Sequence, residues 1–261
     1  MPKFAANLSM LFTEAPFLDR FALAREAGFD GVEFLFPYAY DAQQIAERLR
    51  RYRLELVLHN LPPGDWAAGD RGMACDPRRI EEFRTGVALA LEYAAELGTP
   101  RLHCMAGIVP PGLEPSRARD TYLDNLRYAA RQCRPHGIAL MIEPINHYDI
   151  PGYFLNHSWQ ARELIAATGC DNIFLQYDIY HMQRMEGELA NTIRANLPLI
   201  AHMQLADTPG RHEPGTGEIN YRFLFQLLDE LGYQGWIGCE YQPLGDTASG
   251  LGWRETLTTG R

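Results

Sequence analysis

The chain has 261 residues, of which 46% are hydrophobic and 22% are charged, and its formal net charge is −9. This composition is typical of a folded globular protein and excludes a disordered chain. The acidic balance argues against a protein that binds nucleic acid or a membrane surface, because such polyanionic partners select basic patches.

The numbers of lysine and cysteine residues limit the reaction classes and the cellular compartments that are compatible with the chain. The 24 basic residues include one lysine, Lys3, at the start of the first expected strand. Schiff-base chemistry, pyridoxal phosphate and phosphate loops need an interior lysine amine, so these classes are excluded and we expect no organic cofactor. The 5 Cys residues form no CxxC pair, which is typical of a reducing compartment. The chain shows neither a signal peptide nor the ~18 apolar residues of a membrane span, so we expect a cytoplasmic protein with no membrane partner.

Short apolar runs alternate with longer amphipathic stretches along the chain. The expected strands are Phe4–Asn7, Gly31–Phe34, Leu54–His59, Arg101–Met105, Ala139–Glu143, Ile173–Asp178, Ile200–Gln204 and Trp236–Glu240. The expected helices are Phe17–Ala27, Ala42–Tyr52, Arg79–Leu97, Arg117–Cys133, Ser158–Ala167 and Tyr221–Leu231. A glycine follows several of these helices, as is usual at helix C-termini.

This alternation predicts one α/β domain over residues 1–261. Eight strands that are each followed by a helix-sized segment favour a parallel sheet with right-handed crossovers. Eight is also the number of strands that closes a (β/α)8 TIM barrel, which is the fold we expect. The alternative is an open doubly wound sheet. That sheet would normally carry a glycine-rich phosphate turn after its first strand, where this chain has Asn7-Leu8-Ser9-Met10.

The connection formed by residues 60–77 is longer than the roughly 2–6 residues usual between a strand and a helix. It is rich in Gly and Pro and carries Asp65, Trp66 and Arg71. Long ordered loops at the catalytic face of a barrel are often lids or substrate walls, and we expect this one to be such a wall. The alternative is a surface insertion.

Polar side chains end five of the expected strands, and the carboxyl ends of barrel strands are where active sites lie. The five residues are His59, Glu143, Asp178, Gln204 and Glu240. The last four come from four successive strands, so we expect their oxygen-bearing side chains to reach one depth of the barrel mouth. The alternative for each acid is that it only binds the N-terminus of a helix. That alternative does not account for four polar residues at the ends of four successive strands.

Three of these residues are carboxylic acids, and like charges that converge in a half-buried pocket repel one another. A divalent cation is the simplest group that would hold them together. Carboxylates with an amide oxygen favour Mg²⁺ and, as a second choice, Mn²⁺. Zinc would require more His or Cys ligands. The pattern therefore predicts a metal site at Glu143, Asp178, Gln204 and Glu240.

Further candidates lie close to these strand ends. His181 follows Asp178 by three residues, and Arg211 lies in a glycine-rich loop after Gln204. We expect Arg211 to bind an anion, with a solvated loop arginine as the alternative. We expect His59 to bind a substrate hydroxyl or carboxylate, with a structural histidine as the alternative. His103 is interpreted as structural.

Seven stretches of the chain carry a family resemblance. They are FAANLSMLF, GVEFLFPY, LHNLPPGDWAAGDRG, MIEPINHYDIPG, QYDIYHMQRMEGELA, HEPGTGEINY and GWIGCEYQP. They closely resemble the hydroxypyruvate isomerase family, which belongs to the xylose isomerase-like TIM barrels. The resemblance extends from Phe4 to about Trp253.

This resemblance implies roles for the strand-end residues. It implies that Glu143 and Glu240 act as acid and base. It also implies a divalent metal held at Glu143, Asp178, Gln204 and Glu240, where Gln204 replaces the histidine of related ketose epimerases. His181 resembles the substrate-contacting histidine of those relatives, and Arg211 lies near the position of their substrate-binding arginine.

The implied reaction interconverts hydroxypyruvate and 2-hydroxy-3-oxopropanoate through a cis-enediolate, so the partner is a small anionic 2-oxo or hydroxy acid. A 2-oxo-tetronate isomerase on the same scaffold is the main alternative, and a ketose 3-epimerase is a further one. The net negative charge argues against a metal-dependent endonuclease, which would need a basic surface. The paired glutamates argue against a barrel that only binds small acids, because such a protein needs no acid–base pair. Glyoxylate, glycerate and sugar-acid degradation would each use this chemistry, so the pathway stays open. The sequence also leaves open whether the chain forms a homo-oligomer.

Overall fold

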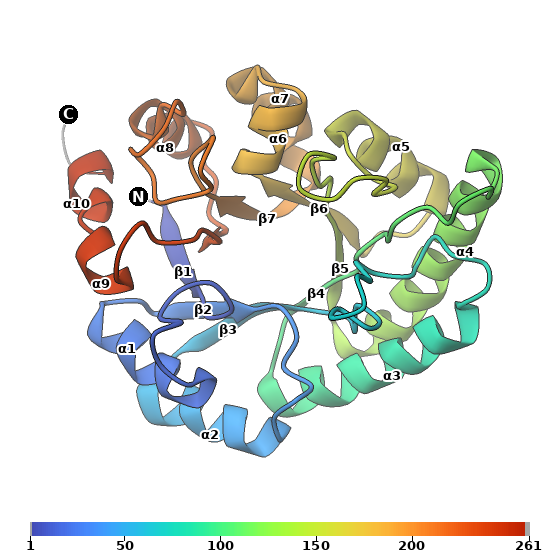
Figure 1. Ribbon diagram of the computed structural model, residues 1–261, viewed down its shortest axis with the longest axis horizontal. Helices are drawn as coiled ribbons and strands as arrows, with labels where there is room; N and C mark the ends of the chain where they lie inside the picture. Colours follow the sequence, from blue (N-terminus) through green and yellow to red (C-terminus); the bar gives the residue numbers. More distant parts are fainter. Residues whose placement is uncertain (1, 259–261) are drawn as a thin grey trace.

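Eight parallel strands pair in chain order from β1 to β8, and β8 pairs with β1 to close the barrel (Figure 1). The structure is a computed structural model that describes residues 2–258. The strands are β1 (Lys3–Asn7), β2 (Gly31–Phe34), β3 (Glu55–Asn60), β4 (Arg101–His103), β5 (Ala139–Ile142), β6 (Ile173–Asp178), β7 (Ile200–Leu205) and β8 (Trp236–Cys239). The prediction of a (β/α)8 TIM barrel is therefore confirmed.

Helices surround the barrel (Figure 1). They are η1 (Phe17–Asp19), α1 (Arg20–Glu26), α2 (Ala42–Tyr52), α3 (Ile80–Leu97), α4 (Pro115–Cys133), η2 (Arg134–His136), α5 (Ser158–Thr168), α6 (Ile179–Met185), α7 (Leu189–Asn196), η3 (Leu197–Leu199), α8 (Tyr221–Glu230), α9 (Thr247–Gly250) and α10 (Trp253–Thr258). Every expected helix is present with ends shifted by at most about two residues, which is the usual uncertainty of helix boundaries. Within residues 2–258, no helix is long and apolar enough to cross a membrane.

Helix α2 illustrates how local sequence produces these elements. The Asp41 carboxylate accepts the backbone N–H of Gln43 at 2.8 Å, which satisfies a donor at the start of the helix. Ile45 and Leu49 lie one turn apart and are buried against the barrel, while charged residues occupy the opposite face. The helix ends at Arg53, whose backbone is left-handed. Capping and one apolar stripe therefore fix both the length and the orientation of this helix.

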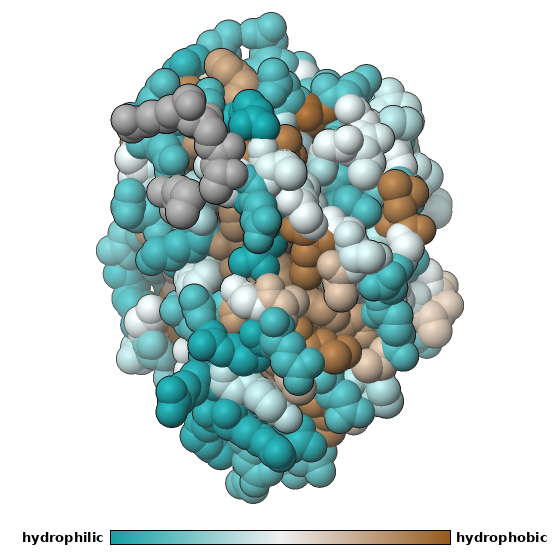
Figure 2. Space-filling view, turned by 90° about the vertical axis from the view of Figure 1, so that its left-hand side faces the viewer, coloured by the Kyte–Doolittle hydropathy of each residue, from teal (hydrophilic) through white to brown (hydrophobic). Residues whose placement is uncertain are grey.

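The apolar core lies mainly between the strands and the surrounding helices, and a small separate cluster fills the lower barrel interior. That interior cluster consists of Ala5, Val57, Leu58 and Met141. On the side of the molecule that carries α1, α9 and α10, the surface is largely hydrophilic, and apolar side chains gather toward its middle (Figure 2). Above the interior cluster, toward the carboxyl ends of the strands, buried polar side chains replace apolar ones. This change from apolar to polar packing marks the position of the site.

Candidate active site

The carboxyl ends of the strands surround a cavity of about 710 Å³. Four of the predicted site residues line it, namely Glu143, His181, Arg211 and Glu240. Trp66, from the long connection after β3, also lines the cavity, as we expect of a substrate wall. The cavity therefore lies at the end of the barrel where sites are expected in this fold.

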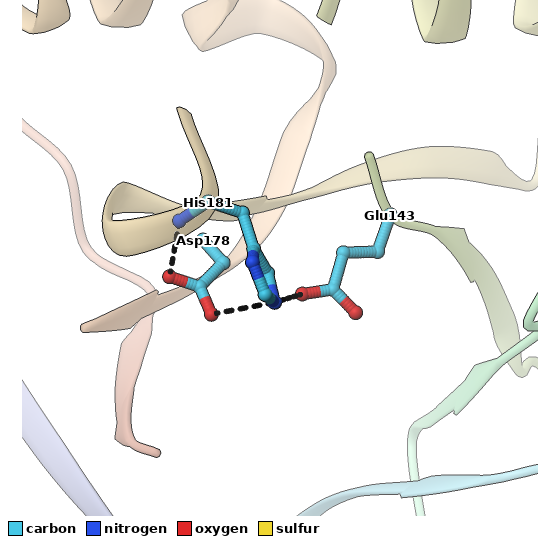
Figure 3. Close-up of side chains that lie close together, drawn as sticks. All are labelled: Glu143, Asp178 and His181. Atoms are coloured by element: carbon cyan, nitrogen blue, oxygen red, sulfur yellow. Dashed lines mark hydrogen bonds and ion pairs between the residues drawn. The ribbon is translucent and has the colours of Figure 1, made fainter. Parts of the chain in front are cut away.

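Glu143, Asp178 and His181 come together (Figure 3), and two of them, Glu143 and His181, line this cavity. Glu143 directly follows β5, and Asp178 is the last residue of β6. Asp178 also begins helix α6, because its Oδ1 atom accepts the backbone N–H of Tyr180 at 2.8 Å and that of His181 at 3.4 Å. The first turn of α6 then places His181 Nε2 3.7 Å from Asp178 Oδ2 and 3.9 Å from Glu143 Oε1.

The two carboxylates of this cluster each have an oxygen without a hydrogen-bond partner, although Arg211 Nη2 lies 3.9 Å from Asp178 Oδ2. Glu143 Oε1 and Asp178 Oδ2 are buried and accept no hydrogen bond from any described residue, which is costly for a carboxylate. Burial raises the pKa of Glu143 well above its usual range, and the nearby Glu240 and Asp178 raise it further. Burial also raises the pKa of Asp178 to about 6, although Arg211 opposes the shift.

Ligand atoms of Glu143, Asp178 and His181 all lie within 4.8 Å of one another. A divalent cation between the two unpartnered oxygens would satisfy both and would favour their charged forms. The residues present therefore fit such an ion. The identity of the ion does not follow from this geometry.

Glu240, which directly follows β8, is held by three donors. Its Oε1 atom accepts from Arg211 Nη2 at 2.7 Å. Its Oε2 atom accepts from Gln204 Nε2 at 2.6 Å and from Asn7 Nδ2 at 3.1 Å. Burial raises the pKa of Glu240 to about 8, and the donors Arg211 and Gln204 limit this rise. Glu240 is therefore oriented firmly while it keeps a high proton affinity.

Gln204 lies opposite Asp178 in the strand register, but its amide oxygen is taken up by a hydrogen bond from Gln176. Its Nε2 atom donates to Glu33 Oε1 at 2.8 Å and to Glu240 Oε2, and carboxylates can only accept. Its Oε1 atom accepts from Gln176 Nε2 at 2.7 Å. The two carboxylates fix the amide orientation, so Gln204 is a bridge between Glu33 and Glu240 here. This differs from our expectation that its oxygen is a metal ligand.

Glu33 is a buried carboxylate that the sequence analysis missed. It lies in β2, is 0% exposed, and accepts from Asn7 Nδ2 at 3.0 Å as well as from Gln204. Its Oε2 atom lies 2.6 Å from His202 Nε2. The available signal was a charged residue inside a short apolar strand, Gly31-Val32-Glu33-Phe34, which places that charge inside the barrel.

Arg211 reaches the cavity from the loop after β7, as predicted. Its guanidinium lies 5.1 Å from the ring centre of Tyr180, and its Nη1 atom lies 3.8 Å from Asp149 Oδ2. The backbone of Arg211 is left-handed, and its carbonyl accepts the N–H of Gln242 at 2.8 Å. Together with its contact to Glu240, this arrangement puts a cationic group at the edge of a carboxylate-rich cavity.

His59 is not part of the cavity lining, and our expectation of a substrate contact there is corrected. Its Nδ1 atom lies 3.1 Å from Thr99 Oγ1, and its ring centre lies 6.3 Å from those of Phe34 and Tyr38. Burial lowers the pKa of His59 to about 3, so the ring is neutral. The next residue, Asn60, lines the cavity instead, because successive side chains of a strand point to opposite faces.

His103 also differs from expectation, since it was interpreted as structural and it lines the cavity. It is the last residue of β4 and is 1% exposed. Its Nε2 atom lies 3.6 Å from Glu143 Oε2. Neither ring nitrogen has a hydrogen-bond partner among the described residues. Burial lowers the pKa of His103 to about 3, so its neutral ring faces Glu143.

Comparison with known proteins gives matches over nearly the whole chain. Residues 21–257 match the family model described as xylose isomerase-like TIM barrel. The chain is 53% identical to a protein of Escherichia coli K12 named hydroxypyruvate isomerase, over 98% of this chain and 99% of the relative. It is 48% identical to a protein of Cupriavidus necator named 2-oxo-tetronate isomerase, over 97% of each. A solved structure titled AP endonuclease, family 2, from Brucella melitensis is 50% identical with a TM-score of 0.95, over 97% of this chain and 98% of that one.

Proposed function

The chain belongs to the family of xylose isomerase-like TIM barrels, and on that premise we propose that it is an isomerase that interconverts hydroxypyruvate and 2-hydroxy-3-oxopropanoate. One observation carries the proposal. Glu143 and Glu240 line the same cavity from the ends of β5 and β8, which are three strands apart in the ring. The relative named hydroxypyruvate isomerase supports this choice of substrate.

The reaction moves a carbonyl group by one carbon. A base removes a proton from C3, the hydroxymethyl carbon of hydroxypyruvate, and the released electron pair forms a C2–C3 double bond while the C2 oxygen becomes negative. A proton then returns to C2, and the hydroxyl proton on O3 moves to O2, which leaves an aldehyde at C3. Two carboxylates that flank the substrate can divide the removal and the return of the carbon-bound proton.

We assign these two transfers to Glu143 and Glu240. Both have a pKa raised by burial, which brings their proton affinity closer to neutral pH, as acid–base catalysis requires. Arg211 is assigned to the carboxylate of the substrate, because an anion needs a local cation in a chain of net charge −9. His181 is assigned to a substrate oxygen. His59 is left out because it does not line the cavity.

A divalent cation is part of this proposal, and no organic cofactor is. Glu143 and Asp178 would hold the ion through their unpartnered oxygens, with Glu240 as the third carboxylate, and Gln204 would keep its role as a donor to Glu240. Such an oxygen set favours Mg²⁺ or Mn²⁺. When bound, the ion would supply positive charge to the substrate oxygens that become negative during proton transfer.

A 2-oxo-tetronate isomerase is the second candidate. Relatives that are 48% and 50% identical carry this name. The cavity of about 710 Å³ also has room for a four-carbon acid with an additional hydroxymethyl group. One carbon changes the binding free energy by only about 1–3 kcal/mol, so both acids need to be tested. A ketose 3-epimerase, the further alternative, is tested with neutral sugars.

Proton NMR in D2O tests the proposal directly. Purified protein is incubated with Mg²⁺ and either hydroxypyruvate, a 2-oxo-tetronate or a neutral ketose. We expect hydroxypyruvate to be converted into 2-hydroxy-3-oxopropanoate with deuterium from the solvent on C2. Turnover of the 2-oxo-tetronate alone would replace our choice by the second candidate. If neither acid is turned over, the proposed function is wrong.

A further inference from the structure

Asn146, in the segment after β5, has an amide group whose orientation is fixed from two sides. Its Oδ1 atom accepts the backbone N–H of Asp149 at 2.9 Å, and a backbone N–H can only donate. Its Nδ2 atom donates to Asp149 Oδ2 at 3.0 Å. That carboxylate also accepts from the hydroxyl of Tyr180 at 2.9 Å and pairs with Arg184, so it is an acceptor. The amide of Asn146 cannot be turned over without losing both bonds.

The same Nδ2 atom lies 2.7 Å from Nδ1 of His181. Both residues are almost completely buried, with exposures of 0% for Asn146 and 2% for His181. Because Nδ2 is a donor, Nδ1 of His181 has to accept and therefore carries no proton. The proton of a neutral imidazole is then on Nε2. One amide thus determines which tautomer His181 adopts.

The Nε2 atom of His181 faces the carboxylates of Glu143 and Asp178 (Figure 3). A nitrogen that carries a proton is a hydrogen-bond donor and has no free electron pair for a metal ion. His181 is close enough to Glu143 and Asp178 to complete a three-residue metal site by distance alone. Its tautomer argues against that role and favours a donor aimed at an oxygen atom in the cavity.

We propose that Asn146 is a positioning residue that holds His181 in its Nε2–H form, so that His181 donates a hydrogen bond to a substrate oxygen and does not coordinate the cation. This rests on the proposed function for the identity of the substrate. A neutral donor of this kind stabilises negative charge on the substrate oxygen as the proton leaves C3. Glu143 and Asp178 would then hold the cation without His181.

The wild-type protein tests the tautomer without any change to the site. Histidine side chains are labelled with ¹⁵N, and long-range ¹H–¹⁵N correlations are recorded near neutral pH without metal. The signals of His181 are assigned by their loss in His181→Gln and by through-space contacts to the Asn146 amide. We expect a proton on Nε2 and none on Nδ1. A proton on Nδ1 would overturn the proposal.

The same NMR experiment also tests whether His181 coordinates the cation, and its result can be separated from that of the proposed function. On addition of Mg²⁺, Nε2 of His181 should keep its proton, and loss of that proton would show coordination and overturn the proposal. The tautomer is measured without substrate, so it is independent of catalysis. If His181 shows the expected form while hydroxypyruvate and the 2-oxo-tetronate are not turned over, the proposed function fails and the effect of Asn146 on the ring stands.

The variant Asn146→Asp tests the role of the amide itself. It replaces the donor beside Nδ1 by an acceptor of the same size, so we expect the proton to move to Nδ1. We expect kcat to fall roughly tenfold or more with a smaller change in KM, because one hydrogen bond to the substrate is lost. Asn156→Asp is the matched control. It removes a donor to the carbonyl of Ile145 in the same segment and leaves the His181 contact intact. An unchanged tautomer in Asn146→Asp would overturn the proposal.

Discussion

Gln204 donates from one amide group to two carboxylates, the partly buried Glu240 at 2.6 Å and the fully buried Glu33 at 2.8 Å. This links the cavity carboxylate to a charge in the barrel interior. The hydrogen bond from Gln204 lowers the pKa of Glu240, against the larger effect of burial.

We therefore expect Gln204→Met to raise the pKa of Glu240, because the donor that stabilises its charged form is removed. The limb of the pH–rate profile in which activity rises with pH should move to higher pH. Profiles of kcat/KM against pH measure this shift. Gln183→Met, which makes the same change in a residue paired with Glu218 near the surface, serves as the control. A profile that stays in place would show that Gln204 does not tune Glu240.

Replacing either proposed proton-transfer residue should remove most of the activity and preserve the fold. We expect Glu143→Gln and Glu240→Gln to lower kcat by about 10²–10⁴, the usual contribution of one acid–base group. Glu143→Gln should also be at least as stable as the wild type, since it replaces a buried ionisable group that has an unpartnered oxygen. Turnover and urea unfolding measure the two effects. Exposed Glu47→Gln is the control, and near-wild-type rates in both variants would contradict the assignment.

Binding of a cation should stabilise the protein, because a ligand that binds only the folded state adds to the free energy of unfolding. We expect the Tm to fall with EDTA and to rise again with Mg²⁺ or Mn²⁺. Asp178→Asn should remove this response, since it takes away one of the two unpartnered carboxylate oxygens. Asp171→Asn, on the surface beside Arg134, is the matched control. A full response in Asp178→Asn would place the cation elsewhere.

The neutral, buried ring of His59 should make stability depend on pH. Its pKa is about 3 in the folded protein and 6.5 when exposed, so between these values the unfolded chain binds more protons. Stability should therefore fall as the pH decreases from 7 to 5, by on the order of 2 kcal/mol for this group. His59→Gln should reduce that pH dependence, as measured by urea unfolding at both values. Exposed His136→Gln is the control, and equal pH dependence in His59→Gln and the wild type would refute the effect.

Arg211→Lys should weaken binding of the anionic substrate, because an ammonium group cannot donate two parallel hydrogen bonds to a carboxylate. We expect KM for hydroxypyruvate to rise roughly tenfold or more. Steady-state kinetics measure this, with Arg134→Lys as the control, since Arg134 pairs with Asp171 on the surface. A KM that is unchanged in Arg211→Lys would remove Arg211 from the substrate site.

The fold could be predicted from local sequence patterns because each strand–helix unit contains residues that mark where its elements begin and end. Gly98 ends α3 with a left-handed backbone, and Asp178 both ends β6 and begins α6. Glu143 and Glu240 could be placed in the cavity because each comes directly after an apolar strand. These features depend on residues close together in the chain, and the sequence alone is sufficient for them.

The predictions for individual site residues that were wrong depend on how one strand pairs with its neighbours. The pairing of β2 with β3 skips Val57, so the alternation of side chains near His59 is shifted, and Asn60 faces the cavity. β4 ends at His103 and not at Met105 as expected, which brings His103 to the mouth. The orientation of Gln204 depends on Glu33, which is far away in sequence. None of these relationships is encoded in one stretch of the chain.

Asp178 serves two structures with one side chain. One oxygen starts the helix that carries His181, and the other lies 3.7 Å from Nε2 of His181 in the group that also contains Glu143. Removal of the whole carboxylate would therefore weaken binding of an ion and displace His181 at the same time. A substitution to Ala at this position cannot distinguish the two effects, whereas Asn keeps a helix-capping oxygen. Any replacement at this position therefore has to satisfy a backbone requirement and a chemical one at the same time.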